Sequence, residues 1–495
     1  MIREGTAERG PGLTHAAALM LATVGVWIAG WNVSPTLGLV LLVPVLVATA
    51  LISVRRPVLA VATVPLLLVV GNVGLPLSLP LVRGQILAVA AVVLIARAKG
   101  YGRRIGWSPV IAAMALLVAA ALVSTLSGVD PARSLRHDVG YLVGLLLAAA
   151  IVVVTVDRSD LLLLASAVCV GGAILCATAL TSIPELQVEN RDASLIVNRP
   201  AGIFGQPNEL GLAAAMTLCF CVAMTVVAHR QRQTWMTALF AVAALMAAVA
   251  LVASLSRGAW IGCALGLVVL ALLLREARTL LISLATVATV GLALLVIAPP
   301  SQNTPVAAQR LLSIFGGQGN PYDERPAARA EAVVQMSENP VLGTGPGTFQ
   351  VAAKQGLAHV EAAQNEEHAH NLALAVGAEQ GVLGVTALLV ATGVGAREAL
   401  RNSRAPALRA SSGDAQSKAT TGLTTRGVSA GAGAALAAVI GHGAVDYPLR
   451  NPVIATMAWL FIGLLAACAR SRTHTHPQKH EATNNEPVAT TAVRR

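Results

Sequence analysis

Hydrophobic residues recur along the chain in stretches of about 18 or more, separated by short polar segments. Such a stretch can cross the hydrocarbon core of a bilayer as one α-helix. We predict about 14 of these helices, and 12 or 13 also fits, because Pro65, Pro76 and Pro80 interrupt the third and fourth. The predicted spans are 13–31, 34–54, 57–72, 84–98, 108–126, 140–156, 160–180, 208–228, 233–253, 258–274, 279–298, 371–395, 428–446 and 452–469. The predicted fold class is therefore an all-α polytopic membrane protein.

Composition excludes a soluble globular protein. Charged residues make up 12% of the chain and hydrophobic residues 55%, whereas soluble domains contain about 25% charged residues. The net charge of +11 is spread over separate short loops, which argues against a nucleic-acid-binding surface. All 6 cysteines fall inside predicted spans without metal-site spacing, so we expect them to pack as small apolar residues.

The positive charges also predict the topology. Short basic loops, such as Arg55-Arg56 and Arg230 to Arg232, fall on one side of the alternating spans. The positive-inside rule makes that side cytoplasmic, with both termini. Residues 1–298 then form an N-terminal bundle of about 11 spans, and 299–370 form a large periplasmic loop with a helical cap. Residues 371–469 hold the last spans with a basic loop at 396–427; that loop and the tail 470–495 are predicted to be disordered.

Several arginines are exceptions to this rule, because they fall on the predicted outer side. They are Arg83, Arg133, Arg136, Arg191, Arg199, Arg257, Arg310, Arg325, Arg329 and Arg450. Arg257 stands where one span ends and the next begins. An arginine so near the hydrocarbon is costly unless it snorkels, with Trp260 as an interfacial neighbour, or binds an anion.

Two outward segments carry further candidate binding residues. Asn208 follows Pro207 at the start of a predicted span, where free N–H groups suit an anion; a simply capped helix is the alternative. Arg325 and Arg329 are four residues apart and therefore share one face of a predicted helix. The glycine-rich turn after them, 343–347, allows close backbone approach.

One histidine is also predicted to lie on the outer side with these arginines. His370, in His368-Ala369-His370-Asn371, stands where the polar loop meets the next span, and histidine titrates closest to neutral pH. Arginines that pair with phosphate oxygens and one histidine that takes a proton indicate a substrate with a phosphate head and a reactive hydroxyl. Glycosyl transfer from a lipid pyrophosphate fits this description.

A last polar group occurs at 442–452, near the C-terminus. His442 and Asp446 are four residues apart on one predicted helix face, and Arg450 follows. They are candidates for contacting the glycan or supporting His370 and Asn371; an interfacial hydrogen-bonded turn is the alternative. The sequence contains no nucleotide-binding glycine loop.

These motifs resemble the O-antigen ligase and polymerase superfamily. The similar blocks are Gly202 to Gly211, Ser256-Arg257-Gly258, Arg325 to Phe349, and His370-Asn371 followed by Gly381-x-x-Gly384, in the same order. The resemblance implies a membrane glycosyltransferase of the C fold class that needs no metal or other cofactor. It makes His370 the catalytic residue and Arg257 and Arg325 the pyrophosphate-binding residues. Arg329 stands where the family usually has tryptophan, so either loop arginine is a candidate.

The resemblance implies transfer of a glycan from an undecaprenyl-pyrophosphate carrier to a sugar hydroxyl of a lipid or glycan acceptor, with inversion. The His-Asn-x9-Gly-x-x-Gly spacing favours an O-antigen ligase slightly over a repeat-unit polymerase, and a protein-glycosylating relative is a third reading. A transporter or flippase of an anionic lipid-linked glycan is the alternative from another class, in which His370 would do no chemistry.

Overall fold

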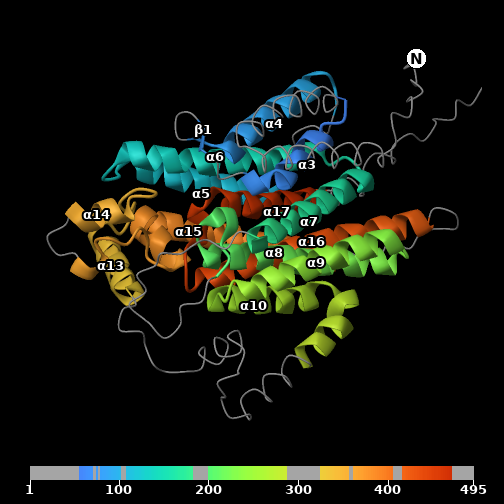
Figure 1. Cartoon of the computed structure of the whole chain (residues 1–495). Helices are drawn as coiled ribbons and strands as arrows, with labels where there is room; N and C mark the ends of the chain where they lie inside the picture. The colour runs from blue at the N-terminus through green and yellow to red at the C-terminus, as the bar shows by residue number, and fades with distance from the viewer. Residues whose placement is uncertain are drawn as a thin grey trace, which may run out of the picture.

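The computed structural model describes residues 55–70, 74–75, 79–101, 108–181, 199–286, 324–355, 360–404 and 415–470. The predicted spans 13–31 and 34–54, most of 279–298 and the tail from 471 onward lie outside the described residues. The described part is an all-α bundle, which confirms the predicted fold class (Figure 1). One short antiparallel pair, β1 (Gly74–Leu75) with β2 (Leu79–Pro80), accompanies the helices.

Among the described residues, 9 helices are long and apolar enough to cross a membrane. They are α4 (Leu81–Ala98), α5 (Pro109–Leu126), α6 (Pro131–Val154), α7 (Arg158–Thr181), α8 (Pro207–Arg230), α9 (Thr234–Ala253), α15 (Leu372–Ser403), α16 (Ala415–Gly443) and α17 (Pro452–Arg470). Counting α10 (Arg257–Leu273) with the helix that follows it, bent by 116°, raises the number to 10. The chain is therefore a multi-pass membrane protein.

Two predicted spans differ from the observed helices. Residues 57–72 do not form one span, since α3 (Val58–Leu66) has only 9 residues and contains Pro65. Helix α6 begins at Pro131 rather than near 140, because Asp130 caps it by accepting a hydrogen bond from the Arg133 N–H at 2.9 Å. Arg133 and Arg136 consequently belong to a helix and not to a loop.

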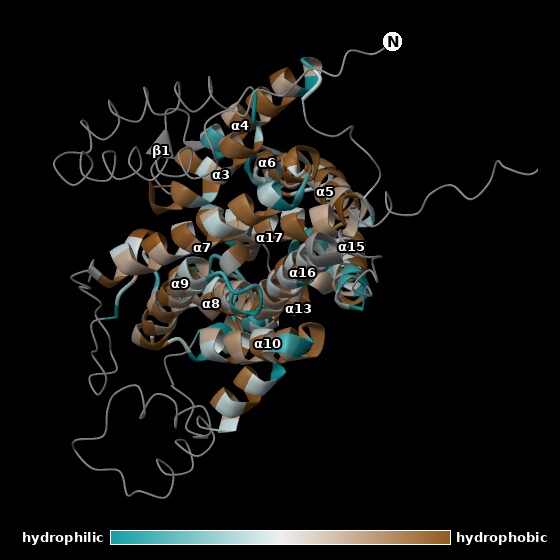
Figure 2. Cartoon of the chain, turned by 90° about the vertical axis from the view of Figure 1, so that its right-hand side faces the viewer, coloured by the Kyte–Doolittle hydropathy of each residue, from teal (hydrophilic) through white to brown (hydrophobic). Residues whose placement is uncertain are grey.

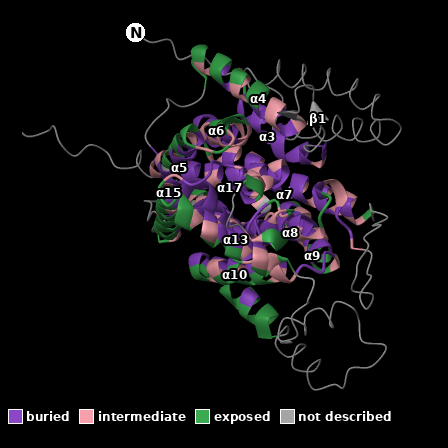
Figure 3. Ribbon diagram, turned by 90° about the vertical axis from the view of Figure 1, so that its left-hand side faces the viewer, coloured by how far each residue is buried: buried purple, intermediate pink, exposed green. Residues whose placement is uncertain are grey.

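Small residues let the central helices approach closely. Helix α8 and α17 each bury 83% of their most apolar window inside the protein. Helix α10 packs on α16 through Gly262 and Gly266, which lie against the backbone of that helix. Apolar residues prevail along these helices (Figure 2), and exposed residues concentrate on the outward faces of α4 and α15 (Figure 3). The cysteines, all free and buried, pack as expected.

The prediction of disorder for 397–427 is wrong for most of that segment. Helix α15 continues to Ser403, and α16 already begins at Ala415. Polar side chains of this part have partners on neighbouring helices: Gln231 Nε2 donates to Thr424 Oγ1 at 2.9 Å, and Arg426 pairs with Glu276 at 3.1 Å. These tertiary contacts stabilise helix in a segment whose composition alone favours disorder.

At the opposite end of the bundle, two short helices form a cap beyond α15 (Figure 1). They are α13 (Arg325–Glu338) and α14 (Phe349–Gln355). The connection between them is bonded into α15: Thr344 N donates to Ala378 O at 3.0 Å, Gly345 N to Glu379 O at 2.8 Å, and Val382 N to Pro340 O at 2.8 Å.

Helix α15 is interrupted where this connection docks. Gly381 has φ 60° and ψ −159°, a conformation that is essentially restricted to glycine. A Cβ at Gly381 would lie 2.4 Å from the Val341 carbonyl carbon and oxygen. The glycine motifs around 343 and 381 are therefore two halves of one docking site between the cap and α15.

Candidate active site

His370 lies immediately before α15, at the junction with the cap. The helix begins after Asn371, whose Oδ1 caps it by accepting a hydrogen bond from Leu374 N at 3.0 Å. The Asn371 side chain also donates to Ala444 O at 2.9 Å, which ties the start of α15 to the turn after α16. His370 itself has φ 48°, a strained backbone conformation for a residue other than glycine.

Two carboxylates contact the imidazole of His370. Asp446 Oδ1 is 3.3 Å from Nδ1, and Glu366 Oε2 is 2.8 Å from Nε2. The His370 side chain keeps 19% of its surface exposed. An imidazole held on both nitrogens, yet still accessible, has a defined orientation at the rim of the bundle.

Asp446 is the centre of a wider polar network. Its second oxygen, Oδ2, lies 3.4 Å from the Asn208 amide nitrogen and 3.7 Å from His442 Nε2. Its Oδ1 also accepts a hydrogen bond from the backbone N–H of Tyr447 at 2.8 Å. Residues from α8, from α16 and from the segment before α15 thus meet at the Asp446 carboxylate. They are far apart in the sequence, so their proximity could not be predicted from it.

The electrostatics of this group favour a charged histidine. Burial lowers the pKa of His370, but the hydrogen bonds and charges of Asp446 and Glu366 outweigh burial and raise the pKa above its usual value. The hydrogen bond with His370 lowers the pKa of Glu366 to about 2. Burial, and then the charge of His370, lower the pKa of His368 to about 3, so His368 stays neutral beside it.

Arg450 approaches the same network from the turn before α17. It pairs with Glu367, and its Nε lies 3.9 Å from Glu209 Oε1. Glu209 also accepts a hydrogen bond from the Asn451 side chain at 2.7 Å.

Arg199 is a second contact of the Asn208 side chain. Its Nη2 donates to Asn208 Oδ1 at 3.1 Å, while its Nε donates to Ser254 O at 2.8 Å. Ser254 precedes α10 by three residues, so this arginine links the starts of α8 and α10.

Of the predicted site residues, His370, Asn371, Asn208, His442, Asp446 and Arg450 come together. Arg257 is the first residue of α10, and the adjacent Gly258 lies against the His442 ring. Arg325 begins α13 after Glu324, which is hydrogen bonded to Glu366. Arg329 stands one turn further along α13, with its Nε buried and without a hydrogen bond among the described residues. Arg257 and Arg325 thus adjoin residues that contact the network, and the roles assigned to all three arginines stay predictions.

Three residues of the site have the geometry to hold a metal ion. His368, His370 and Asp446 each offer a ligand atom, and these atoms lie within 4.8 Å of one another. However, Asp446 and Glu366 already occupy both ring nitrogens of His370, and His368 Nδ1 accepts a hydrogen bond from His370 N at 3.2 Å. The three residues thus form a self-contained hydrogen-bonded set, from which we derive no metal-dependent step.

Sequence reasoning missed Glu366 as a contact of His370. Glu366 precedes the histidine by four residues, a spacing from which a contact can be predicted when the segment is a helix. Here residues 365–370 form turns and bends, and the contact arises from the fold of the loop. Glu209 was also not among the candidates, because next to Pro207 it indicated only the start of a helix.

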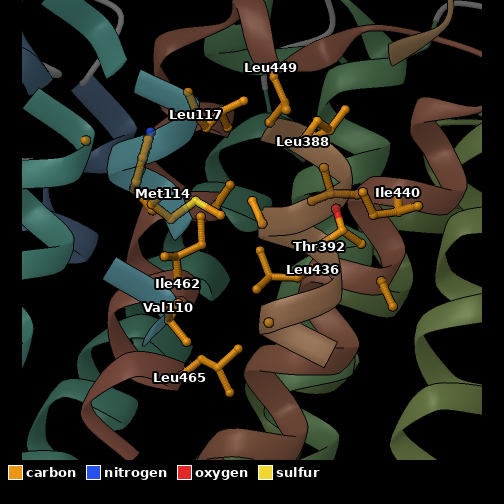
Figure 4. Close-up of a pocket in the computed structure, with 18 of the residues that line it drawn as sticks. Val110, Met114, Leu117, Leu388, Thr392, Leu436, Ile440, Leu449, Ile462 and Leu465 are labelled. Carbon is orange, nitrogen blue, oxygen red and sulfur yellow. The ribbon is translucent and has the colours of Figure 1, made fainter. Parts of the chain in front are cut away.

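An apolar cavity of about 470 Å³ opens beside this network. Side chains of α5, α15, α16 and α17 point into it, among them Met114, Leu388, Leu436 and Ile462 (Figure 4). Its end next to the network is lined by Tyr447 and Arg450, and Arg83 and His137 from α4 and α6 also line it. The cavity therefore joins an apolar interior to a polar, positively charged mouth.

Comparison with known proteins agrees with this arrangement. Residues 241–389 match the family model described as O-antigen ligase, a range that includes α10, the cap and the first part of α15 with its break at Gly381. No curated protein is similar enough to the chain to give a match. The matched range contains Arg257, Arg325 and His370, and this part of the chain is therefore similar to the O-antigen ligase and polymerase superfamily.

Proposed function

We propose that this protein transfers a glycan from an undecaprenyl-pyrophosphate carrier to a sugar hydroxyl at the periplasmic face of the bacterial inner membrane. The family supports membrane glycosyl transfer in general. The observation that carries the specific proposal is His370, held by Asp446 at the rim of the bundle, with arginines around it.

In this mechanism His370 is the general base. Asp446 holds Nδ1, so Nε2 is the nitrogen that accepts the proton of the attacking hydroxyl. Glu366 occupies Nε2 in the structure and has to give way to the acceptor. The hydroxyl oxygen then bonds to the anomeric carbon of the donor as the bond from that carbon to the pyrophosphate oxygen breaks, with inversion.

The leaving group of this reaction is an undecaprenyl pyrophosphate anion. Arginine forks pair bidentately with phosphate oxygens and stabilise the charge that develops on them. Arg257, adjacent in sequence to the Gly258 that lies against the His442 ring, and Arg325, next to the Glu324 that contacts Glu366, are the residues to which we assign this role. Arg329 is the alternative to Arg325, since its Nε has no hydrogen bond within the described part of the chain.

The proposal is tested with the purified chain, a lipid-linked glycan donor and a sugar acceptor. Release of undecaprenyl pyrophosphate that depends on the acceptor, together with a glycosylated acceptor, is the expected result. Movement of the intact donor across a vesicle membrane without release would instead favour the transporter alternative.

The ligase and polymerase readings share this chemistry and differ in the acceptor. The surface polysaccharide of a deletion strain, separated on a gel, distinguishes them. Loss of a ligase leaves long chains unattached to the core lipid, whereas loss of a polymerase leaves a single repeat unit on it.

The role of Asp446 predicts a change in the pH profile. Because the pKa of His370 is raised, transfer should increase with pH as His370 loses its proton. Asp446→Asn removes the main partner that raises this pKa, so the acid limb should move to lower pH by about 1 unit or more, and the plateau rate should fall. Asp160→Asn at the start of α7 serves as a matched control, and a profile unchanged in both variants would contradict the assigned role.

A further inference from the structure

Three outward arginines have no part in the proposed reaction, and the fold brings them together. Arg83 comes from α4, and Arg133 and Arg136 come from α6. Arg83 Nη1 donates to Arg136 O at 3.3 Å, and Arg133 Nε donates to Gly347 O at 2.6 Å. All three lie close enough to His137 to interact with it electrostatically.

One carboxylate, the buried Glu379, interacts electrostatically with Arg133, whereas Arg83 and Arg136 have no ion-pair partner among the described residues. The side chains of Arg83 and Arg133 donate hydrogen bonds to neutral backbone carbonyls. Within the described ranges, no aspartate or glutamate forms an ion pair with either residue or with Arg136. Asp138, the nearest carboxylate in sequence, is buried and accepts a hydrogen bond from Thr125 at 2.5 Å.

This cationic group borders the apolar cavity. Arg83 and His137 both line its mouth, together with Tyr447 and Arg450. The Arg83 guanidinium lies across Gly140, where a Cβ would come within 2.8 Å of Nη2, so the glycine leaves room for it. The guanidinium groups of Arg83 and Arg450 therefore line the same space as many leucine, isoleucine and valine side chains. Figure 4 shows part of this apolar lining.

Placing these arginines beside an apolar cavity costs free energy unless a ligand is bound. Arginine near the hydrocarbon region loses hydration, and positive charge on the outer side runs against the topology rule. A phosphate group would offset both costs, because it provides several charged oxygens for guanidinium N–H donors. An apolar chain attached to that phosphate would fill the cavity behind it.

The group is also separate from Arg257, one of the arginines assigned to the donor. Helices α4 and α6 lie on one side of the bundle and α10, which begins with Arg257, on the other, with α15, α16 and α17 between them (Figures 1 and 2). His370 precedes α15 and is thus placed between two cationic regions. In an inverting displacement the acceptor and the leaving group occupy opposite faces of the reacting carbon.

We propose that Arg83, Arg136 and His137 bind the phosphate of a second lipid, whose chain enters the cavity and which presents the acceptor to His370. The acceptor would then be a glycan linked to a phosphate-bearing lipid. The assignment of this lipid as acceptor rests on the proposed glycosyl transfer, whereas the phosphate site itself does not.

The test counts lipids bound to the full chain by native mass spectrometry in detergent. With undecaprenyl phosphate as probe, the unmodified protein should bind two molecules, and Arg83→Gln should bind one, with at least a 10-fold loss of affinity at the second site. Arg136→Gln, whose side chain is exposed, should show the same loss without disturbing the packing. Arg97→Gln, at the other end of α4, is the matched control and should still bind two.

Two further probes identify what the site recognises. Undecaprenol, which lacks the phosphate, should not occupy the second site, and inorganic phosphate should not displace the lipid at millimolar concentration. Two bound lipids in both Arg83→Gln and Arg136→Gln, equal binding of undecaprenol, or displacement by inorganic phosphate would each overturn the proposal. His370→Ala should keep both lipids, so a failure of the proposed reaction is distinguished from a failure of this site.

Discussion

Replacement of His370 by alanine should reduce glycan transfer by about 100- to 10,000-fold, the usual contribution of a general base. The expected loss is confined to the chemical step, because His370 contacts Asp446 and Glu366 at the rim and fills no part of the core. The measurement is the initial rate of undecaprenyl pyrophosphate release by purified protein with saturating lipid-linked donor.

The control for this experiment is His368→Ala. His368 lies 4.2 Å from His370 between ring centroids, yet it has no contact with Glu366 or Asp446 among the hydrogen bonds of the site. A much smaller loss is expected for it. Transfer by His370→Ala at the normal rate, in protein that elutes and melts as the unmodified chain does, would refute the assignment of His370 as the base and favour the transporter alternative.

The second large effect concerns folding rather than chemistry. Gly381→Ala places a Cβ 2.4 Å from the Val341 carbonyl and forces alanine into a backbone conformation that only glycine adopts readily. Backbone strain and overpacking together should cost about 2–6 kcal/mol, a large share of the stability of a typical domain. We expect a strong decrease in thermal stability and in the yield of monodisperse protein.

Gly393→Ala in the same helix provides a matched control. No atom lies within 4 Å of a Cβ built at Gly393, and its backbone is helical, so alanine should be tolerated. Melting of the protein in detergent, followed by intrinsic fluorescence, compares the two variants. Equal melting temperatures would mean that the cap does not require the break in α15.

Much of the fold could be predicted from sequence, because lipid imposes a simple rule on the chain. Every backbone group in the hydrocarbon core must be hydrogen bonded within its own helix, so apolar stretches of sufficient length become helices. The spans from 108–126 to 233–253 and the last three correspond to observed helices for this reason. The rule gives no information about polar segments, and the predicted disorder of 397–427 was wrong where contacts such as Arg426 with Glu276 stabilise helix.

The candidate site could likewise be predicted only in part from the sequence. Motif spacing selected His370, Arg257 and Arg325, and the family match at 241–389 includes all three. The i, i+4 spacing of His442 and Asp446 also predicted a shared face, which agrees with their distance of 3.7 Å. These inferences depend on local geometry, which the sequence encodes directly.

Contacts between residues far apart in the sequence could not be predicted from local geometry. The sequence by itself determined that the chain crosses the membrane many times, and it predicted a chemical centre made of a histidine with outward arginines. Only the tertiary structure decided that Asp446, 76 residues away, holds that histidine, that Glu366 covers its other nitrogen, and that Arg83 and His137 share a cavity mouth with Arg450. The physical reason is that these contacts depend on how the helices pack, which small residues on many helices determine jointly.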